Sequence, residues 1–159
     1  MIGYTRTNRK KDKYLNNLYL SKDLKKSVGN LDYLIIACPL TKSTKNIVNS
    51  NIFKLMKKEA VIVNIARGGI INEKDLYFAL KDRLIGGAII DTWFKYPQNK
   101  QQNGFKPSTF SFNRMKNVIM SPHISAWSES MIERRSKVIS DNINRLYNNK
   151  GLINRVSNT

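Results

Sequence analysis

Short apolar runs alternate with amphipathic segments along most of this chain. The runs that predict β-strands are residues 2–4, 18–20, 31–38, 61–65, 86–91 and 118–120. Between them, apolar residues recur at three- and four-residue spacing, which predicts helices over 22–28, 51–58, 72–83 and 129–147. Apolar strands that alternate with such helices are typical of a parallel sheet covered on both faces. The pattern therefore predicts an α/β protein.

Polar residues and one glycine mark the predicted helix ends. Ser21, Ser50 and Ser128 precede three of the helices, and we expect each side chain to cap its helix. Asn72 opens the remaining helix, and Gly29 is expected to close the first one.

Three predicted strands end in, or are followed by, residues whose side chains often act in catalysis or ligand binding. Arg67 follows the run 61–65 and precedes two glycines, Asp91 ends the run 86–91, and His123 follows the run 118–120 as the only histidine. The carboxyl ends of parallel strands line one crevice, so we expect these side chains to share a site. The guanidinium of arginine suits a carboxylate or a polarised carbonyl oxygen. Each residue also has a structural alternative, as a surface arginine, a loop-capping aspartate or a packed histidine.

The cysteine content narrows the range of functions. Cys38 is the only cysteine and ends an apolar run before Pro39, so we expect a packed thiol rather than a nucleophile. One cysteine excludes an internal disulfide, and with one histidine it argues against a zinc site. No apolar run approaches the roughly 18 residues of a membrane span, and no signal core follows Met1. The expected compartment is the cytoplasm.

The chain is strongly basic. It has 28 Lys and Arg residues against 11 Asp and Glu residues, a formal net charge of +17. Such a charge attracts polyanions. The basic residues are nevertheless spread along the chain, apart from 6–13, and aromatic residues are not interleaved with them as in a stacking platform. Dedicated nucleic-acid binding is therefore not expected.

Several linked segments resemble one family, the D-isomer-specific 2-hydroxyacid dehydrogenases, in their NAD(P)-binding domain. The matching segments, in the family's order, are 34–41 with Ser43 and Thr44, 63–73, 86–91 and 121–125. The resemblance covers residues 2–156. It implies a three-layer, Rossmann-type, doubly wound parallel sheet, with residues 1–159 as a partial NAD(P)-binding domain.

The resemblance also implies roles for individual residues. Arg67 corresponds to the arginine that grips a 2-oxo acid and polarises its carbonyl group. His123 corresponds to the acid/base that protonates the carbonyl oxygen, and Asp91 to the residue that holds the nicotinamide carboxamide. Further positions expected to line the cofactor are Cys38, Pro39, Thr44, Ile65, Ala66 and Ser125. The implied reaction is the reversible reduction of a 2-oxo acid by a homodimer.

Three departures from the family pattern bear on activity. The first strand, the Gly-rich phosphate loop and the first helix are expected before Ile2 and are missing from this sequence, which removes the main anchor of the pyrophosphate. The separate substrate domain is also absent. Tyr96 stands five residues after Asp91, where the family has the glutamate that orients the histidine. We therefore expect the chain by itself to be inactive.

The end of the first predicted strand bears on the choice of cofactor. Thr5, Arg6 and Thr7 stand where the family has the acidic residue that accepts the ribose hydroxyls. Hydroxyl and guanidinium groups suit a 2′-phosphate, so NADP is favoured over NAD. The alternative is a solvated basic loop in a chain of this charge.

Two other functions remain open from the sequence. One is a non-catalytic dimerisation module that binds a dinucleotide or another polyanion. The other is the remnant of a truncated gene.

Overall fold

The computed structural model describes residues 1–7, 10–98 and 104–155. The chain divides into two compact units, residues 1–123 and 124–159, and each is described by itself. Asn8 and Arg9, which belong to the predicted basic loop, lie outside the described residues.

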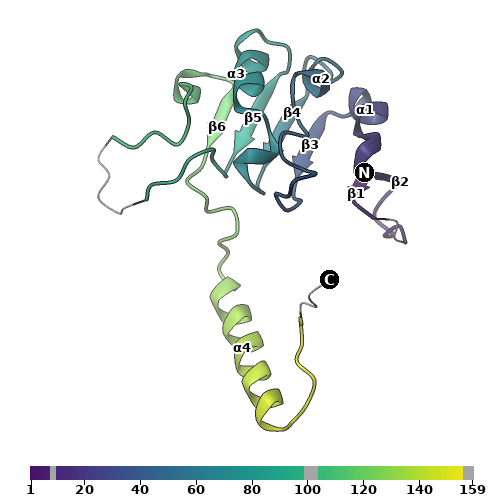
Figure 1. Cartoon of the computed structure of the whole chain (residues 1–159), viewed down its shortest axis with the longest axis vertical. Coiled ribbons are helices and arrows are strands. Elements are labelled where there is room, and N and C mark those ends of the chain that lie inside the picture. The colour runs from purple at the N-terminus through teal and green to yellow at the C-terminus, as the bar shows by residue number, and fades with distance from the viewer. Residues whose placement is uncertain (8–9, 99–103, 156–159) are drawn as a thin grey trace. The chain divides into compact units, whose positions relative to one another are not determined.

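Two parallel sheets organise the first unit (Figure 1). Strands β1 (Ile2–Thr5) and β2 (Asn17–Leu20) form the smaller sheet. The larger sheet has the order β3-β4-β5-β6, and all of its strands are parallel. Its strands are β3 (Tyr33–Ile36), β4 (Val61–Asn64), β5 (Gly87–Ile90) and β6 (Val118–Met120).

Short helical segments connect the strands. The α-helices of this unit are α1 (Leu24–Ser27), α2 (Ser50–Phe53) and α3 (Glu73–Lys81). The 3₁₀ turns are η1 (Ser21–Asp23), η2 (Val28–Asn30), η3 (Gly68–Ile70) and η4 (Phe112–Arg114). The predicted order of strands and helices along the chain is confirmed.

One hydrophobic core holds the larger sheet and its helices together. Ile52 and Phe53 of α2 and Leu76 of α3 are buried in the same cluster as alternate residues of the strands, including Ile62. Successive side chains of a strand point to opposite faces, so this core covers one face of the sheet. On the opposite face of β3, Tyr33 and Ile35 are exposed, like Ile119 of β6.

The helix start predicted at Asn72 is correct to within one residue, and the three predicted serine caps are wrong. The side chain of Asn72 accepts a hydrogen bond from the backbone N–H of Asp75 and caps α3. Ser50 is already helical, and Asn49 before it caps α2. Ser21 is likewise the first residue of a 3₁₀ turn rather than a cap, because the helix begins earlier than the apolar spacing indicates.

The second unit contains helix α4 (Met131–Tyr147), which begins later than predicted. Ser130 occupies its N-cap position and makes no side-chain cap bond, so the predicted cap at Ser128 is wrong. Apolar side chains on α4 are exposed within this unit: Ile132, Ile139, Ile143 and Leu146. No helix in the described part of the chain is long and apolar enough to cross a membrane.

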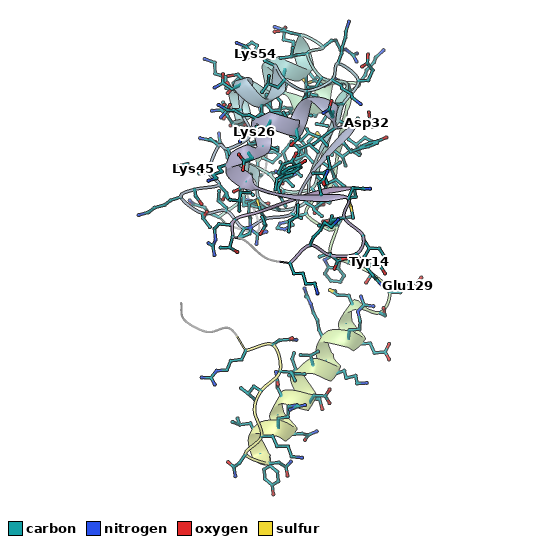
Figure 2. The ribbon with its side chains drawn as sticks, turned by 90° about the vertical axis from the view of Figure 1, so that its right-hand side faces the viewer. Tyr14, Lys26, Asp32, Lys45, Lys54 and Glu129 are labelled. Atoms are coloured by element: carbon teal, nitrogen blue, oxygen red, sulfur yellow. The ribbon has the colours of Figure 1, made fainter. Side chains whose placement is uncertain are left out.

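Positive charge is distributed over several elements of the first unit. The exposed lysines labelled in Figure 2 belong to α1 (Lys26), to the turn before α2 (Lys45) and to the residue after α2 (Lys54). The ammonium group of Lys26 lies 2.7 Å from the carboxylate of Asp23 and lowers the pKa of that carboxyl group. The lysines do not follow one another along a single helix as a stripe.

Candidate active site

Three of the site residues predicted from the sequence, Arg67, Asp91 and His123, follow strands of the larger sheet at its carboxyl edge. Ile36, Asn64, Ile90 and Met120 are paired across the four strands, so the residues after them form the next row. Backbone hydrogen bonds continue into that row: Ile65 N–H donates to Ile36, Asp91 N–H to Asn64 and Ser121 N–H to Ile90, at 3.0 to 3.3 Å. The hydrogen-bond pattern of the sheet therefore continues for one residue beyond the strands, and the spacing between neighbouring strands is kept at this edge.

Register and strand spacing place Arg67 and His123 on either side of the strand that carries Asp91. Each lies two residues beyond the row, Arg67 after β4 and His123 after β6. Strands two apart in a sheet are about 9 to 10 Å apart.

The backbone around Arg67 is shaped by Asn64, which is 1% exposed. The Asn64 side chain accepts a hydrogen bond from Ala66 N–H (3.1 Å) and donates one to the Arg67 carbonyl oxygen (3.0 Å). These bonds close the turn after β4 and leave the Arg67 side chain exposed. Its guanidinium donates to the carbonyl oxygen of Ala66 at 2.6 Å. A charged donor is therefore presented at the sheet edge.

Asp91 and Trp93 tie the end of β5 to the end of β6. Asp91 is 2% exposed, and its carboxylate accepts a hydrogen bond from the Ser121 hydroxyl at 2.6 Å. The indole N–H of Trp93 donates to the Ser121 carbonyl oxygen at 2.9 Å. Because both bonds involve residue 121, they fix the backbone two residues before His123.

His123 is exposed and has a positive φ of 61°. Histidine is among the non-glycine residues that tolerate this region, and such a conformation is common at functional sites. The imidazole ring lies 5.6 Å from the Tyr96 ring, centroid to centroid, at an interplanar angle of 50°. Tyr96 is therefore next to the histidine.

The residues after β3 form an exposed loop beside this edge. Thr44 Oγ1 donates to the carbonyl oxygen of Pro39 at 2.8 Å and accepts from Thr41 N–H at 2.7 Å. Cys38 is exposed, so the prediction of a packed thiol is wrong. The physical reason is that β3 ends at Ile36 and the two residues that follow leave the sheet.

The other residues predicted to bind the cofactor follow the smaller sheet or belong to the second unit. Thr5 ends β1 and lines an open hollow of about 350 Å³ together with Lys11 and residues 16–20. Arg6 and Thr7 follow it and are exposed. Ser125 belongs to the second unit, so its relation to the strand ends is not described.

The edge also includes apolar and uncharged polar groups. The described residues contain no group of three or more His, Cys, Asp or Glu side chains that could hold a metal ion. Ile65, 43% exposed, offers an apolar surface next to the Arg67 turn. The hydroxyl group of Thr92 is buried with no hydrogen-bond partner, next to Asp91.

Three residues that shape this edge were not identified from the sequence. Asn64 had one available signal, since it is the only polar residue in the run 61–65. Ser121 and Trp93 had none, because their partners lie 30 and 28 residues away in the sequence.

A parallel sheet whose strands are joined through helices packed against it is typical of a Rossmann-like fold. The chain belongs to the D-isomer specific 2-hydroxyacid dehydrogenase family, since the model of that family's NAD binding domain matches residues 1–125. The predicted family and the predicted fold class are both confirmed.

The chain is similar to curated reductases and to solved structures. It is 35% identical over 112 residues to glyoxylate reductase from Thermococcus kodakarensis, which covers 70% of this chain and 31% of that protein. A D-isomer specific 2-hydroxyacid dehydrogenase from Xanthobacter autotrophicus, solved with NADPH and MES, matches 98% of this chain and 60% of its own, with a TM-score of 0.79 at 22% identity. An NADPH-dependent glyoxylate/hydroxypyruvate reductase from Sinorhizobium meliloti, solved with NADP and sulfate, matches 98% and 47%, with a TM-score of 0.77 at 24% identity.

The chain spans 31–40% of the length of the first curated relatives that it matches.

Proposed function

We propose that this chain supplies the nucleotide-binding part of an NAD(P)-dependent D-2-hydroxyacid dehydrogenase, which reduces a small 2-oxo acid reversibly to the 2-hydroxy acid. The observation that carries the proposal is the position of Arg67 and His123 on either side of Asp91 at one sheet edge. The similarity to glyoxylate reductases supports a 2-oxo acid as the substrate class.

Each residue has a separate role in the proposed reaction. The nicotinamide supplies the hydride. Arg67 binds the substrate carboxylate and draws electron density toward the carbonyl oxygen, a task suited to a fixed guanidinium fork. His123 donates a proton to that oxygen and takes it back in the reverse direction, as an imidazole can near neutral pH. Asp91, held by Ser121, accepts a hydrogen bond from the carboxamide and orients the ring.

The cofactor is proposed to be NADP rather than NAD. The exposed Arg6 follows directly after β1, and Lys11 lines the same hollow as Thr5. Two cations near hydroxyl groups suit a 2′-phosphate better than a free ribose. In a full-length protein that contains this chain, Arg6→Ala should weaken binding of NADP and leave binding of NAD unchanged. An equal loss for both dinucleotides would contradict this preference.

The assembly is proposed to be a homodimer. The exposed side chains Ile132, Ile139, Ile143 and Leu146 recur along one side of α4. A stripe of this kind can pair with the same stripe of a second copy in an isologous interface. Ile139→Glu should then convert the dimer to a monomer in size-exclusion chromatography with light scattering. A parent chain that is already monomeric would refute the proposal.

A chimera tests the proposed function without any assumption about the remainder of the protein. The 112 matched residues of the Thermococcus kodakarensis glyoxylate reductase are replaced by the corresponding residues of this chain. The chimera should oxidise NADPH in a glyoxylate-dependent reaction. A folded chimera that binds NADPH but reduces no 2-oxo acid would contradict the proposal. Failure to bind a dinucleotide, together with retention on heparin at physiological salt, would instead favour a polyanion-binding module.

A further inference from the structure

Tyr96 is the one residue in direct ring contact with His123 among the described residues, and its own position is fixed. The Tyr96 hydroxyl oxygen accepts a hydrogen bond from the backbone N–H of Trp93 at 3.1 Å. Trp93 is 6% exposed and is itself anchored to Ser121. The phenol ring is therefore connected, through Trp93, to the strand end that carries the histidine.

The contact closes a ring of interactions between β5 and β6. The indole N–H of Trp93 donates to Ser121, which lies two residues before His123 in the chain. The His123 ring contacts the Tyr96 ring, and the Tyr96 hydroxyl oxygen accepts a hydrogen bond from the backbone N–H of Trp93. Tilted aromatic pairs at a centroid distance of 4.5–7 Å attract each other and prefer particular orientations. The Tyr96 ring thus restricts the rotation of an imidazole that solvent alone would leave free, since His123 is exposed.

We propose that Tyr96 is a positioning residue for His123, which it orients by ring contact where a carboxylate would orient it by charge. The proposal rests on the proposed role of His123 as acid/base. The phenol ring orients the imidazole without placing a negative charge beside it. Tyr96 touches neither substrate nor cofactor in this role.

Proton NMR of the chain tests the proposal, since His123 is the only histidine and its two ring C–H resonances are unambiguous. In the parent chain, one set of nuclear Overhauser contacts should connect these protons to the Tyr96 ring. Tyr96→Leu should abolish the contacts and shift both imidazole resonances, because the ring current is lost. Tyr96→Phe retains a ring and should restore the contacts. Tyr33→Leu is the matched control, since Tyr33 is 63% exposed at the first residue of β3 in the same unit, and it should leave both resonances unchanged.

Two outcomes would overturn the proposal: no contact between the rings in the parent chain, or imidazole resonances in Tyr96→Leu that match those of the parent. The backbone amide spectrum of each variant shows whether it is folded. If Tyr96→Leu unfolds, the parent contacts and Tyr96→Phe decide the outcome. The measurement uses no substrate or cofactor, so a chimera without turnover would refute the proposed function and leave this contact standing.

Discussion

Gly68, directly after Arg67, is the position where a single methyl group should be least tolerated. A Cβ atom built there would lie 2.3 Å from the carbonyl oxygen of Trp93, 2.5 Å from its carbonyl carbon and 2.8 Å from the backbone nitrogen of Phe94. These are backbone atoms in a buried region, so no side-chain rotation relieves the overlap. The close approach, rather than a positive φ, explains why glycine occupies this position.

The cost of Gly68→Ala follows from overpacking. Extra methyl groups in a well-packed interior cost about 1 to 3 kcal/mol, and contact with backbone places this site at the upper end. A chain of this size loses about 2 to 4 °C in Tm per kcal/mol. We expect a fall of about 6 to 12 °C in thermal denaturation followed by circular dichroism, with a lower urea midpoint.

Gly69→Ala is the matched control, one residue along the chain. Its Cβ would meet only the side chain of Leu40, at 3.2 and 3.6 Å. Leu40 is 44% exposed and can move, so the change should cost no more than about 0.5 kcal/mol. If the two variants have equal stability, the close packing of the Arg67 turn against Trp93 is refuted.

Three further changes test local features of the first unit. Asn72→Ala removes the side-chain bond to Asp75 N–H and should lower the free energy of unfolding by about 1 kcal/mol in urea denaturation, whereas an unchanged value would contradict the cap. Arg83→Gly should raise stability by roughly 1 kcal/mol, since Arg83 adopts φ 55° after α3; a loss would show that its side chain matters more than its backbone. Ser121→Ala removes a hydrogen bond to the buried Asp91 carboxylate and should cost about 1.5 to 3 kcal/mol, and a neutral result would refute that contact.

The order of elements and the family could be predicted from the sequence because both depend on long local signals. The apolar runs around Ile62 and Ile90 are continuous enough to identify parallel strands, and strand direction then places their last residues at one edge. Asn72 was identified as the start of a helix because a segment with helical apolar spacing follows it. These features depend on neighbours in the sequence.

The rest of the site depends on partners that are distant in the sequence. The bonds that join Asp91 and Trp93 to Ser121 cross 30 and 28 residues, so no local pattern indicates them. The exposure of Cys38 depends on where pairing between β3 and β4 ends, and an apolar run does not determine that point. The contact between Tyr96 and His123 requires the loop after β5 to fold back over the end of β6.

We propose the carboxyl edge of the larger sheet as the active site, with Arg67 and His123 as its catalytic residues. This assignment is tested most directly by glyoxylate-dependent NADPH oxidation in the chimera carrying His123→Ala or Arg67→Ala, with Lys116→Ala as an exposed control. Loss of a general acid or of an electrostatic donor typically lowers the rate about 10²- to 10⁴-fold. We expect losses of this size for both variants, with NADPH binding retained and the control unaffected. Turnover within a few-fold of the parent chimera in either variant would contradict it.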